Sequence, residues 1–598
     1  MNAPLRGTDG RPRSPLRIAN CSGFLGDRLA AAREMVEGGP IDFLTGDYLA
    51  ELTMLILWKA RAKDPTAGYA STFLKQMEQV LGTCIDRGIR VVVNAGGLSP
   101  AGLAQKVREL AEKTGVRARV AHVEGDDLLP RRADLVARGV DFAHAETGQP
   151  LAAAGVEPIT ANAYLGAWGI VAALESGADV VICPRVTDAS VVVGPAAWHF
   201  GWARDDWDRI AGAIVAGHVI ECGPQATGGN YSFFREIPGL DHPGFPIAEV
   251  YEDGSSVITK HPGTGGRVSV GTVTAQLLYE IASPRYPNPD AVARFDTIAL
   301  REEAADRVRI SGVRGEPAPA ETKVCINYLG GFKNSMTFVL TGLDVEEKAE
   351  LVRSTLLGAV GGAGAFDELD VRLLRTDQPD AAMNEAATAL LRITVKDRDP
   401  SKVGRRFANA AVEMALASYP GFFCTAPPSA ESAFGVYWPA LVPREVIEEV
   451  VVTADGERKS IAPPPLVRAE PIPAAAPLDV AVPTGPTRRA PLGTVFGARS
   501  GDKGGNANVG IWAPDAAAYA WLADFLTPAR FGALVPEAAV LEVRRYDFPN
   551  LLALNFVVVG LLGDGVAAST RSDPQAKGLG EYLRARWVDL PESLLAKS

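Results

Sequence analysis

The feature that most constrains this chain is an alternation of short apolar runs with amphipathic segments along residues 16–183. Strands that alternate with helical segments are typical of a parallel sheet covered by helices. The run at 179–183 is apolar after its first residue, as expected for a strand buried on both faces. We therefore predict a large, mostly parallel α/β domain with strands at 16–22, 41–45, 89–94, 118–123 and 179–183.

Beyond these strands the pattern becomes mixed. A helix is expected over 162–175, followed by Gly177 in the left-handed conformation that ends many helices. Between 223 and 281, frequent Gly, Pro and Asn residues indicate loops and antiparallel strands. Short alternating runs at 256–260 and 267–273 are predicted as strands in this part of the chain.

A Pro- and Ala-rich segment, 461–491, divides the chain, because this composition favours a stiff, extended linker. Before it we expect a mixed second lobe, with helices at 345–357 and 402–418. After it we expect a small α+β domain, with strands at 493–497, 509–512, 541–546 and 553–559 and helices near Ala517 and Leu579. The predicted division is a flexible tail (1–15), an α/β domain (16–460, with sub-lobes 16–290 and 291–460), the linker and a C-terminal domain (492–598).

Composition and charge exclude several classes of function. The formal net charge is −11, which repels a nucleic acid backbone, and the first fifteen residues lack the apolar core of a secretion signal. No apolar run has the roughly 18 residues that span a membrane, so we expect a cytoplasmic protein. The six cysteines form no C-x-x-C pair, and the zinc-peptidase, P-loop and nucleophile-elbow motifs are missing from the sequence. No metal site and no tightly bound cofactor is therefore predicted.

Two loops that contain glycine follow predicted strands. Ser22 and Gly23 stand where the first strand is expected to give way to a helix, and Asn94, Gly96 and Gly97 follow the third strand. Open α/β sheets bind ligands at the carboxyl ends of their strands, and amides at a helix start attract anions. These residues are therefore candidate ligand contacts, although tight turns without a ligand explain them equally well.

Charged residues come directly after the strand at 179–183. Arg185, Thr187 and Asp188 could bind a carboxylate or phosphate and transfer a proton. The alternative is an ion pair that caps the next helix, with Thr187 or Asp188 as its N-cap. Glu221 is a further candidate for proton transfer because it opens a glycine-rich segment.

Two glycine-rich segments, 221–231 and 260–267, could form anion-binding nests of backbone amides. They contribute candidate ligand contacts, and His261 is a candidate catalytic residue because it stands within the second glycine-rich segment. A hairpin loop that binds nothing explains the second segment equally well. The candidate contacts in these segments are Asn230, Gly263, Gly265 and Arg267.

The C-terminal domain opens with an unusually polar segment after its first predicted strand. Arg499, Asp502, Lys503 and Asn506 stand close together among glycines, and this density of polar groups is typical of a binding loop. The predicted linker is long enough for this loop to dock over the strand ends of the first domain. A crystal structure in which Arg499 and Asp502 lie more than about 20 Å from Asn94 in every assembly would contradict that arrangement.

Several motifs, in this order along the chain, resemble those of the acyclic terpene utilisation family AtuA. They are IANCSGFLGD (18–27), DFLTGDYLAE (42–51), NAGGL (94–98), KHPGTGGR (260–267) and RSGDKGGN (499–506). The resemblance covers nearly the whole chain. It implies a long AtuA domain followed by a smaller domain with a ferredoxin-like fold, and a role in the breakdown of citronellol- and geraniol-type terpenes through branched acyl-CoA thioesters.

The resemblance leads to a first hypothesis, an enzyme that hydrates, dehydrates or cleaves a branched acyl-CoA without a metal. Asp188 or Glu221 would transfer the proton, Arg185 would hold a carboxylate, and the glycine loops would stabilise an oxyanion. Coenzyme A would enter only as part of the substrate. Assembly into a homo-oligomer is left open.

Two alternatives remain. The first is a non-catalytic subunit that binds an acyl-CoA or a carboxylase of the same pathway. The second is a thioester or phosphate hydrolase with His261 as base, for which Cys222 and Ser232 are only neighbours in sequence and no nucleophile is evident.

Overall fold

The structure is a computed structural model that describes residues 14–468 and 472–596. Most of the predicted tail and part of the predicted linker therefore lie outside the described residues. The described residues divide into two compact units. The first takes in those up to 327, those within 437–566 and those from 575 on, and the second consists of 328–436 and 567–574. The domain boundaries expected from the sequence stay predictions.

A mixed sheet of eleven strands forms the centre of the first unit. Its middle is parallel and pairs in the order β1-β2-β3-β6-β4, with bounds Leu16–Asn20, Phe43–Gly46, Arg90–Val93, Val180–Ile182 and Val120–Glu124. The bounds of each strand lie within two residues of those of a predicted apolar run. The α/β fold class is thereby confirmed for this part of the chain.

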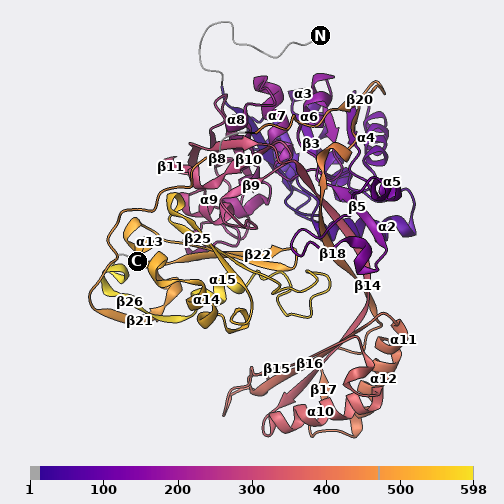
Figure 1. Ribbon diagram of the computed structural model, residues 1–598, viewed down its shortest axis with the longest axis vertical. Helices are drawn as coiled ribbons and strands as arrows, with labels where there is room; N and C mark the ends of the chain where they lie inside the picture. Colours follow the sequence, from indigo (N-terminus) through magenta and orange to yellow (C-terminus); the bar gives the residue numbers. More distant parts are fainter. Residues whose placement is uncertain (1–13, 469–471, 597–598) are drawn as a thin grey trace. The chain divides into compact units, whose positions relative to one another are not determined.

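Helices cover both faces of these strands (Figure 1). On one face, α1 (Ala31–Glu37), α3 (Ser71–Arg87) and α4 (Pro100–Thr114) bury alternate strand residues in an apolar core. On the other face, α7 (Ser190–Phe200) packs between its neighbours α6 (Trp168–Glu175) and α8 (Trp207–Ile220). Two further helices are α2 (Glu51–Lys63) and α5 (Arg132–Ala137).

The predicted helix at 162–175 begins too early. Residues 158–163 form strand β5 (Pro158–Ala163), which pairs with β14, and α6 starts at Trp168. The Asn162 side chain donates to the Asp126 carboxylate at 2.7 Å, so a partner distant in sequence holds this segment extended. The expected helix end is confirmed, because Gly177 has a φ of 85°.

Antiparallel strands extend the central sheet at both edges. One edge continues through β7 (Pro246–Val250), β8 (Ser256–Lys260), β12 (Arg307–Ser311) and β11 (Ala299–Ala304), and the other through β19 (Glu449–Val452) and β20 (Arg458–Ile461). The prediction of a strand at 256–260 is confirmed. A separate three-stranded sheet contains β9 (Arg285–Pro287), β10 (Ala291–Arg294) and β13 (Arg314–Pro317).

The predicted strand at 267–273 is wrong, since most of it belongs to helix α9 (Val270–Leu277). Ser269 caps this helix: its hydroxyl accepts from the Thr272 amide at 3.2 Å, and the Thr272 hydroxyl accepts from the Ser269 amide at 3.0 Å. This reciprocal capping box was a helix signal in the sequence that outweighs the β-branched residues nearby.

The second unit is an antiparallel sheet covered by helices, which confirms the mixed character expected over 295–455. Its strands pair in the order β15 (Glu368–Leu374), β16 (Thr388–Asp397), β14 (Glu321–Thr341) and β17 (Phe423–Cys424). The chain enters this unit within β14 and leaves it within β18 (Ser432–Pro443). The helix α10 (Val345–Val360) confirms one prediction, whereas Gly404 breaks the other into α11 (Pro400–Val403) and α12 (Arg405–Glu413).

The C-terminal part is a four-stranded antiparallel sheet with helices, as expected for an α+β domain. Its strands pair in the order β22 (Gly497–Lys503), β23 (Asn506–Trp512), β25 (Ala553–Val558) and β24 (Val543–Phe548). Its helices are α13 (Ala516–Phe525), α14 (Pro528–Leu534), α15 (Leu579–Arg584) and α16 (Glu592–Leu595), and a strand pair joins β21 (Thr487–Pro491) to β26 (Trp587–Pro591). Figure 1 shows these elements, coloured orange to yellow, beside α9 of the same unit.

Two predictions for this part need correction. No strand spans 493–497, where a short 3-10 turn (Leu492–Thr494) precedes β22. The polar segment predicted as a loop is the hairpin β22–β23, in which Asp502 faces Ala507 across the ladder. Gly504 and Gly505 form its two-residue turn, a glycine pair that favours tight hairpins.

Candidate functional site

A cluster of charged side chains gathers where the parallel strands of the first unit end. Asp47 follows β2, Asn94 follows β3, and Arg185 and Asp188 follow β6. Because β2, β3 and β6 run in parallel and are neighbours in the sheet, their carboxyl ends share one edge. This edge is the usual ligand-binding side of open α/β sheets.

Asp47 is a buried carboxyl that Asn94 holds in place. The Asn94 side-chain amide donates to Asp47 Oδ1, and its oxygen accepts from the Tyr48 amide at 2.7 Å. Burial first, and then the neighbouring Asp188 carboxylate, raise the pKa of Asp47 well above its usual value. Asn94 therefore orients a proton-carrying group, and both ends of its amide already have protein partners.

Arg185 is the largest fully buried side chain near this edge, with 2% of its surface exposed. It donates to the Asp188 carboxylate and to the Leu49 carbonyl, the latter at 2.6 Å, and it lies over the Tyr164 ring. Although burial lowers the pKa of Arg185, Asp188 and the other acidic neighbours raise it further. Arg185 stays charged and fixes Asp188, and its two terminal nitrogens donate to protein groups. That it holds a substrate carboxylate stays a prediction.

Glu51 forms a second acidic point of the cluster. Its carboxylate accepts from the Tyr164 hydroxyl at 2.8 Å and from Lys323 at 3.1 Å. Burial alone would raise the pKa of Glu51, but Lys323 and Arg185 hold it below the usual value. Glu51 is therefore a permanent anion, in contrast to Asp47.

Glu221 lies at the end of α8 and has 7% of its surface exposed. Burial, followed by the Asp188 and Glu280 carboxylates, raises the pKa of Glu221 well above its usual value. One of its oxygens lies 3.3 Å from Nδ1 of His218, whose Nε2 lies 3.1 Å from the Gln276 carbonyl. Burial lowers the pKa of His218 to about 4, so the ring is neutral near pH 7, and its Nδ1 makes no hydrogen bond within the described residues.

The hairpin β22–β23 completes the cluster from the C-terminal part of the same unit. Lys503 donates to the Glu280 carbonyl at 2.9 Å, and Asn508 accepts from the Glu280 amide at 2.8 Å. Asn508 also donates to Asn555, which in turn donates to the carbonyls of residues 281 and 282 at 3.1 and 2.7 Å. Both asparagines are fully buried, so they fix the hairpin against the loop that carries Glu280.

Arg499 and Lys577 lie beside Tyr279 in this same region. The Arg499 guanidinium lies 4.4 Å from the Tyr279 ring centre and donates to Gln225, and Lys577 donates to the Tyr279 hydroxyl. Burial lowers the pKa of both cations. The C-terminal segment 499–508 therefore contacts Gln225 and Glu280. That it also reaches the strand end at Asn94 stays a prediction.

The remaining predicted residues of the hairpin have structural partners. Asp502 lies 3.9 Å from Lys577, at the edge of the cluster. The Asn506 oxygen accepts from the Gly560 amide at 2.8 Å, which supports the hairpin turn.

Thr187, predicted near Asp188 as a ligand contact or helix cap, pairs its hydroxyl with that of Ser190 at 2.6 Å.

The glycine loops do not offer the free amides that the anion-binding hypothesis needs. The Gly23 amide donates to the Asp27 carboxylate at 2.8 Å, and the Gly96 and Gly97 amides donate to carbonyls at 3.0 and 3.4 Å. A Cβ at Gly23 would lie 2.7 Å from the Cys222 backbone, so close packing explains the glycine. Ser22 donates to the Phe24 carbonyl, and α1 begins only at Ala31, so no helix start faces this loop.

The candidates from the second glycine-rich segment lie apart from the cluster's contacts. His261 is buried against α1, with Nε2 2.9 Å from the Met35 carbonyl, and burial lowers its pKa. Gly263 and Arg267 are exposed, and a Cβ at Gly265 would lie 2.2 Å from the Gly239 carbonyl. Asn230 is exposed in a left-handed turn with a φ of 60°. These positions have structural explanations, and the structure links none of them to the cluster.

Several members of the cluster were missed in the sequence. Asp47 and Glu51 follow a predicted strand, so the rule that selected Asp188 could have found them. No sequence signal points to His218, Glu280 or Lys323, because their partners are distant along the chain. Cys222 is a poor nucleophile, because burial and Glu221 raise the pKa of its thiol well above the usual value.

Within the described ranges, no group of three or more His, Cys, Asp and Glu side chains is arranged to hold a metal ion. Over the same residues, no helix is long and apolar enough to cross a membrane.

Comparison with known proteins identifies the two parts of the chain. A family model described as acyclic terpene utilisation family protein AtuA matches residues 16–453, and one described as AtuA ferredoxin-like domain matches residues 490–589. The two models confirm the resemblance drawn from the motifs, and the second confirms the ferredoxin-like class of the C-terminal part. No curated protein and no solved structure matches the chain.

Proposed function

This chain belongs to the AtuA family of acyclic terpene utilisation proteins, and from that premise we propose that it is an enzyme acting on a branched acyl-CoA thioester. The proposed reaction is addition or removal of water, or cleavage of a carbon–carbon bond beside the thioester. These reactions all pass through a thioester enolate, so each needs groups that remove one proton and deliver another.

The observation that supports this proposal most strongly is a pair of buried carboxyl groups, Glu221 and Asp47. Burial and then the Asp188 carboxylate, which pairs with Arg185, raise the pKa of both. A carboxyl that keeps its proton near neutral pH is a general acid, and its conjugate carboxylate is a base. Carboxyl groups whose surroundings differ are typical of proton-transfer sites.

In the addition of water, a carboxylate takes a proton from the water whose oxygen bonds to the β-carbon of an unsaturated thioester. The electron pair of the double bond moves to the thioester as an enolate, which then takes a proton at the α-carbon from the protonated carboxyl. In the cleavage, the base takes the proton of a 3-hydroxyl, the carbon–carbon bond breaks, and the departing thioester enolate is protonated. Glu221 is our candidate for the acid, and Asp188 for the base.

The enolate needs a positive neighbour, and lysines are better placed for this than the glycine amides. Lys503 and Lys577 come from the C-terminal part, and Lys323 comes from β14. Each can donate to a developing oxyanion, which a preorganised cation stabilises more than the neutral thioester. The Lys503 pKa is lowered by burial and by Lys323, so this ammonium gains most from a new anionic partner.

The test is to incubate the full chain with a branched α,β-unsaturated acyl-CoA and with a branched 3-hydroxyacyl-CoA, and to follow the products by mass spectrometry. Gain or loss of one water, or two cleavage products, is expected. Glu221→Gln should lower the rate about 100-fold or more, and Glu303→Gln on the exposed strand β11 is the matched control.

Two outcomes would contradict the proposal. Equal rates for Glu221→Gln and the unchanged chain would remove the assigned acid. Thermal stabilisation by acyl-CoA without turnover would favour the alternative of a non-catalytic binding subunit, because binding to the native state raises its stability whether or not chemistry follows.

A further inference from the structure

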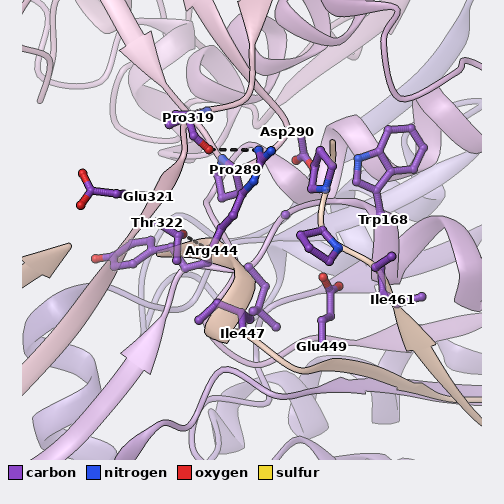
Figure 2. A pocket seen from close by; sticks show the side chains of 16 residues that line it. Trp168, Pro289, Asp290, Pro319, Glu321, Thr322, Arg444, Ile447, Glu449 and Ile461 are labelled. Carbon is purple, nitrogen blue, oxygen red and sulfur yellow. Dashed lines mark hydrogen bonds between the residues drawn. The ribbon is translucent and has the colours of Figure 1, made fainter. Parts of the chain in front are cut away.

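A pocket separate from the polar cluster lies between the start of α6, the loop before β10 and the end of β20 (Figure 2). Its empty volume is about 510 Å³, part of which is open to solvent. The walls are mainly apolar and rich in proline, and they include Pro289, Pro319, Ile447, Ile461, Pro463 and Pro464. None of these wall residues belongs to the proposed catalytic cluster.

Two buried donors on the pocket wall have no partner among the described residues. Trp168 is 8% exposed and its indole Nε1 makes no hydrogen bond. Arg444 is 6% exposed, and while one of its terminal nitrogens donates to the Pro319 carbonyl at 3.0 Å, the other makes no hydrogen bond. Figure 2 shows the two side chains on different sides of the pocket. Buried donors left without acceptors are costly, so their retention points to an acceptor supplied by a ligand.

Three carboxyl groups also line the pocket: Asp290, Glu321 and Glu449. Glu321 is exposed, and the other two differ in their partners. Both oxygens of Asp290 accept from the Ala167 amide, at 3.1 and 2.9 Å, so this group is satisfied. Glu449 Oε1 is buried and makes no hydrogen bond within the part of the chain that the structure describes. Burial first, and then Asp290, raise the pKa of Glu449 to about 8, so its carboxyl is mostly protonated at neutral pH and can donate.

We infer that this pocket binds a small carboxylic acid whose apolar body rests on the proline and isoleucine walls. The carboxylate would accept from the Trp168 indole and the Arg444 guanidinium, the two donors that lack partners. An arginine with an unpaired donor recognises a carboxylate, whereas both oxygens of Asp290 already accept from the Ala167 amide. The unpaired hydrogen-bond donors on the wall therefore favour an acid over an ammonium ligand. The apolar walls supply the non-directional part of the affinity, as in most small-molecule sites.

Tyr164 connects the pocket to the polar cluster. Tyr164 lines the pocket, and its hydroxyl donates to Glu51 of the cluster at 2.8 Å. The Thr322 hydroxyl, also on the pocket wall, donates to the Tyr164 carbonyl at 3.0 Å. The binding of an acid in the pocket does not depend on the proposed catalytic function and can be measured without turnover.

The experiment is calorimetric titration of the full chain with three probes that share a branched body and differ in their head group. The probes are 3-methylbutanoate, 3-methylbutan-1-ol and 3-methylbutylamine. We expect 3-methylbutanoate to bind most tightly. Trp168→Phe, which keeps a ring and removes the indole donor, should weaken that binding about three- to tenfold. Trp521→Phe is the control, because Trp521 is equally buried at 8% in the core of the C-terminal part.

A second variant tests the carboxyl that faces the bound acid. Above a pKa of about 8 Glu449 is charged and should repel the acid, so the affinity should fall about tenfold between pH 7 and pH 9. Asp290, with its pKa raised by burial to about 6, already titrates below this window, and the guanidinium groups of Arg204 and Arg444 are the nearby cations. Glu449→Gln should abolish the dependence on pH.

Three results would overturn the inference. Preferential binding of the amine would make the site one for cations. No binding of any probe would mean that the pocket takes no small branched ligand. Equal affinity of 3-methylbutanoate for the unchanged chain and for Trp168→Phe would place the acid elsewhere.

Discussion

At the scale of single residues, the acids of the candidate site differ in whether a cation pairs with them or burial favours their protonated form. Asp188 pairs with Arg185 and Glu51 pairs with Lys323, whereas burial favours the protonated forms of Asp47 and Glu221. Exposed aspartate and glutamate side chains would instead titrate together near their usual values. Burial therefore favours the protonated forms of Asp47 and Glu221, whereas the Lys323 and Arg185 cations favour the charged form of Glu51.

Asp188→Asn tests the ion pair at this scale. Arg185 is 2% exposed, so it cannot recover the lost charge from water. We expect the variant to lose about 1–3 kcal/mol of stability, measured as a lower urea midpoint with an unchanged slope, and to lose turnover of the acyl-CoA. Full turnover in Asp188→Asn would remove this carboxylate from the mechanism, even if stability falls as expected.

The raised pKa values also predict how the rate depends on pH. If Glu221 gives its proton to the enolate, the rate falls as pH rises through its raised pKa, because the acid form is lost. The measurement is a profile of kcat against pH with a branched acyl-CoA. In Glu221→Gln the remaining slow rate should no longer fall as pH rises through this range. If the alkaline fall of the rate persists unchanged in the variant, another group is responsible for it.

At the scale of elements, the hairpin β22–β23 brings the C-terminal part to the strand ends. Its residues Lys503 and Asn508 both bind the backbone of Glu280, a non-glycine residue with a φ of 57°. A left-handed backbone at such a residue is uncommon and needs support from its surroundings. The hairpin supplies that support, so the position of the Glu280 carboxylate depends on a segment more than 220 residues away in the chain.

Asn508→Ala tests this coupling. The variant loses the acceptor for the Glu280 amide and the donor to Asn555, so we expect about 1–3 kcal/mol of destabilisation and reduced turnover. Asn550→Ala is a matched control, because Asn550 also joins the C-terminal part to earlier residues, through the carbonyls of Phe295 and Ile298 at 2.8 and 2.9 Å. The control should lose stability and keep its rate; equal loss of rate in both variants would show that only stability matters.

At the scale of the whole molecule, buried acids make stability depend on pH in an unusual direction. Burial raises the pKa of Asp126 to about 7 and that of Glu449 to about 8. Each acid then binds its proton more tightly in the folded state than in the unfolded chain. The stabilisation is fully present below the unfolded pKa and is lost as pH rises through the folded pKa.

We therefore expect the free energy of unfolding to fall between about pH 6 and pH 8 and to level off above the raised pKa values, measured by urea titration at each pH. His218, whose pKa burial lowers to about 4, adds a small opposite trend only below its ordinary value near 6.5. Glu449→Gln should flatten the slope, with Glu303→Gln unchanged as control. A slope that rises with pH would contradict the assignment of these acids as buried and protonated.

The sequence already determined much of the central sheet. Five apolar runs marked β1, β2, β3, β4 and β6, because strands buried on both faces need apolar residues at nearly every position. It also marked Arg185 and Asp188, since a polar residue directly after such a strand lies at the binding edge. The Ser269–Thr272 capping box is also present in the sequence and marks the start of α9, although the alternating pattern there predicts a strand.

What only the tertiary structure decided is which polar groups meet and which are already satisfied. Glu51 with Lys323, Lys503 with Glu280, and Arg499 with Gln225 join residues more than 200 positions apart, and no local pattern encodes such pairs. The same holds for the glycine loops: their composition favours anion binding, yet the Gly23 amide is already bound to Asp27. A periodic pattern reflects the burial of neighbouring residues, whereas hydrogen-bond saturation and pKa depend on everything that packs around a group.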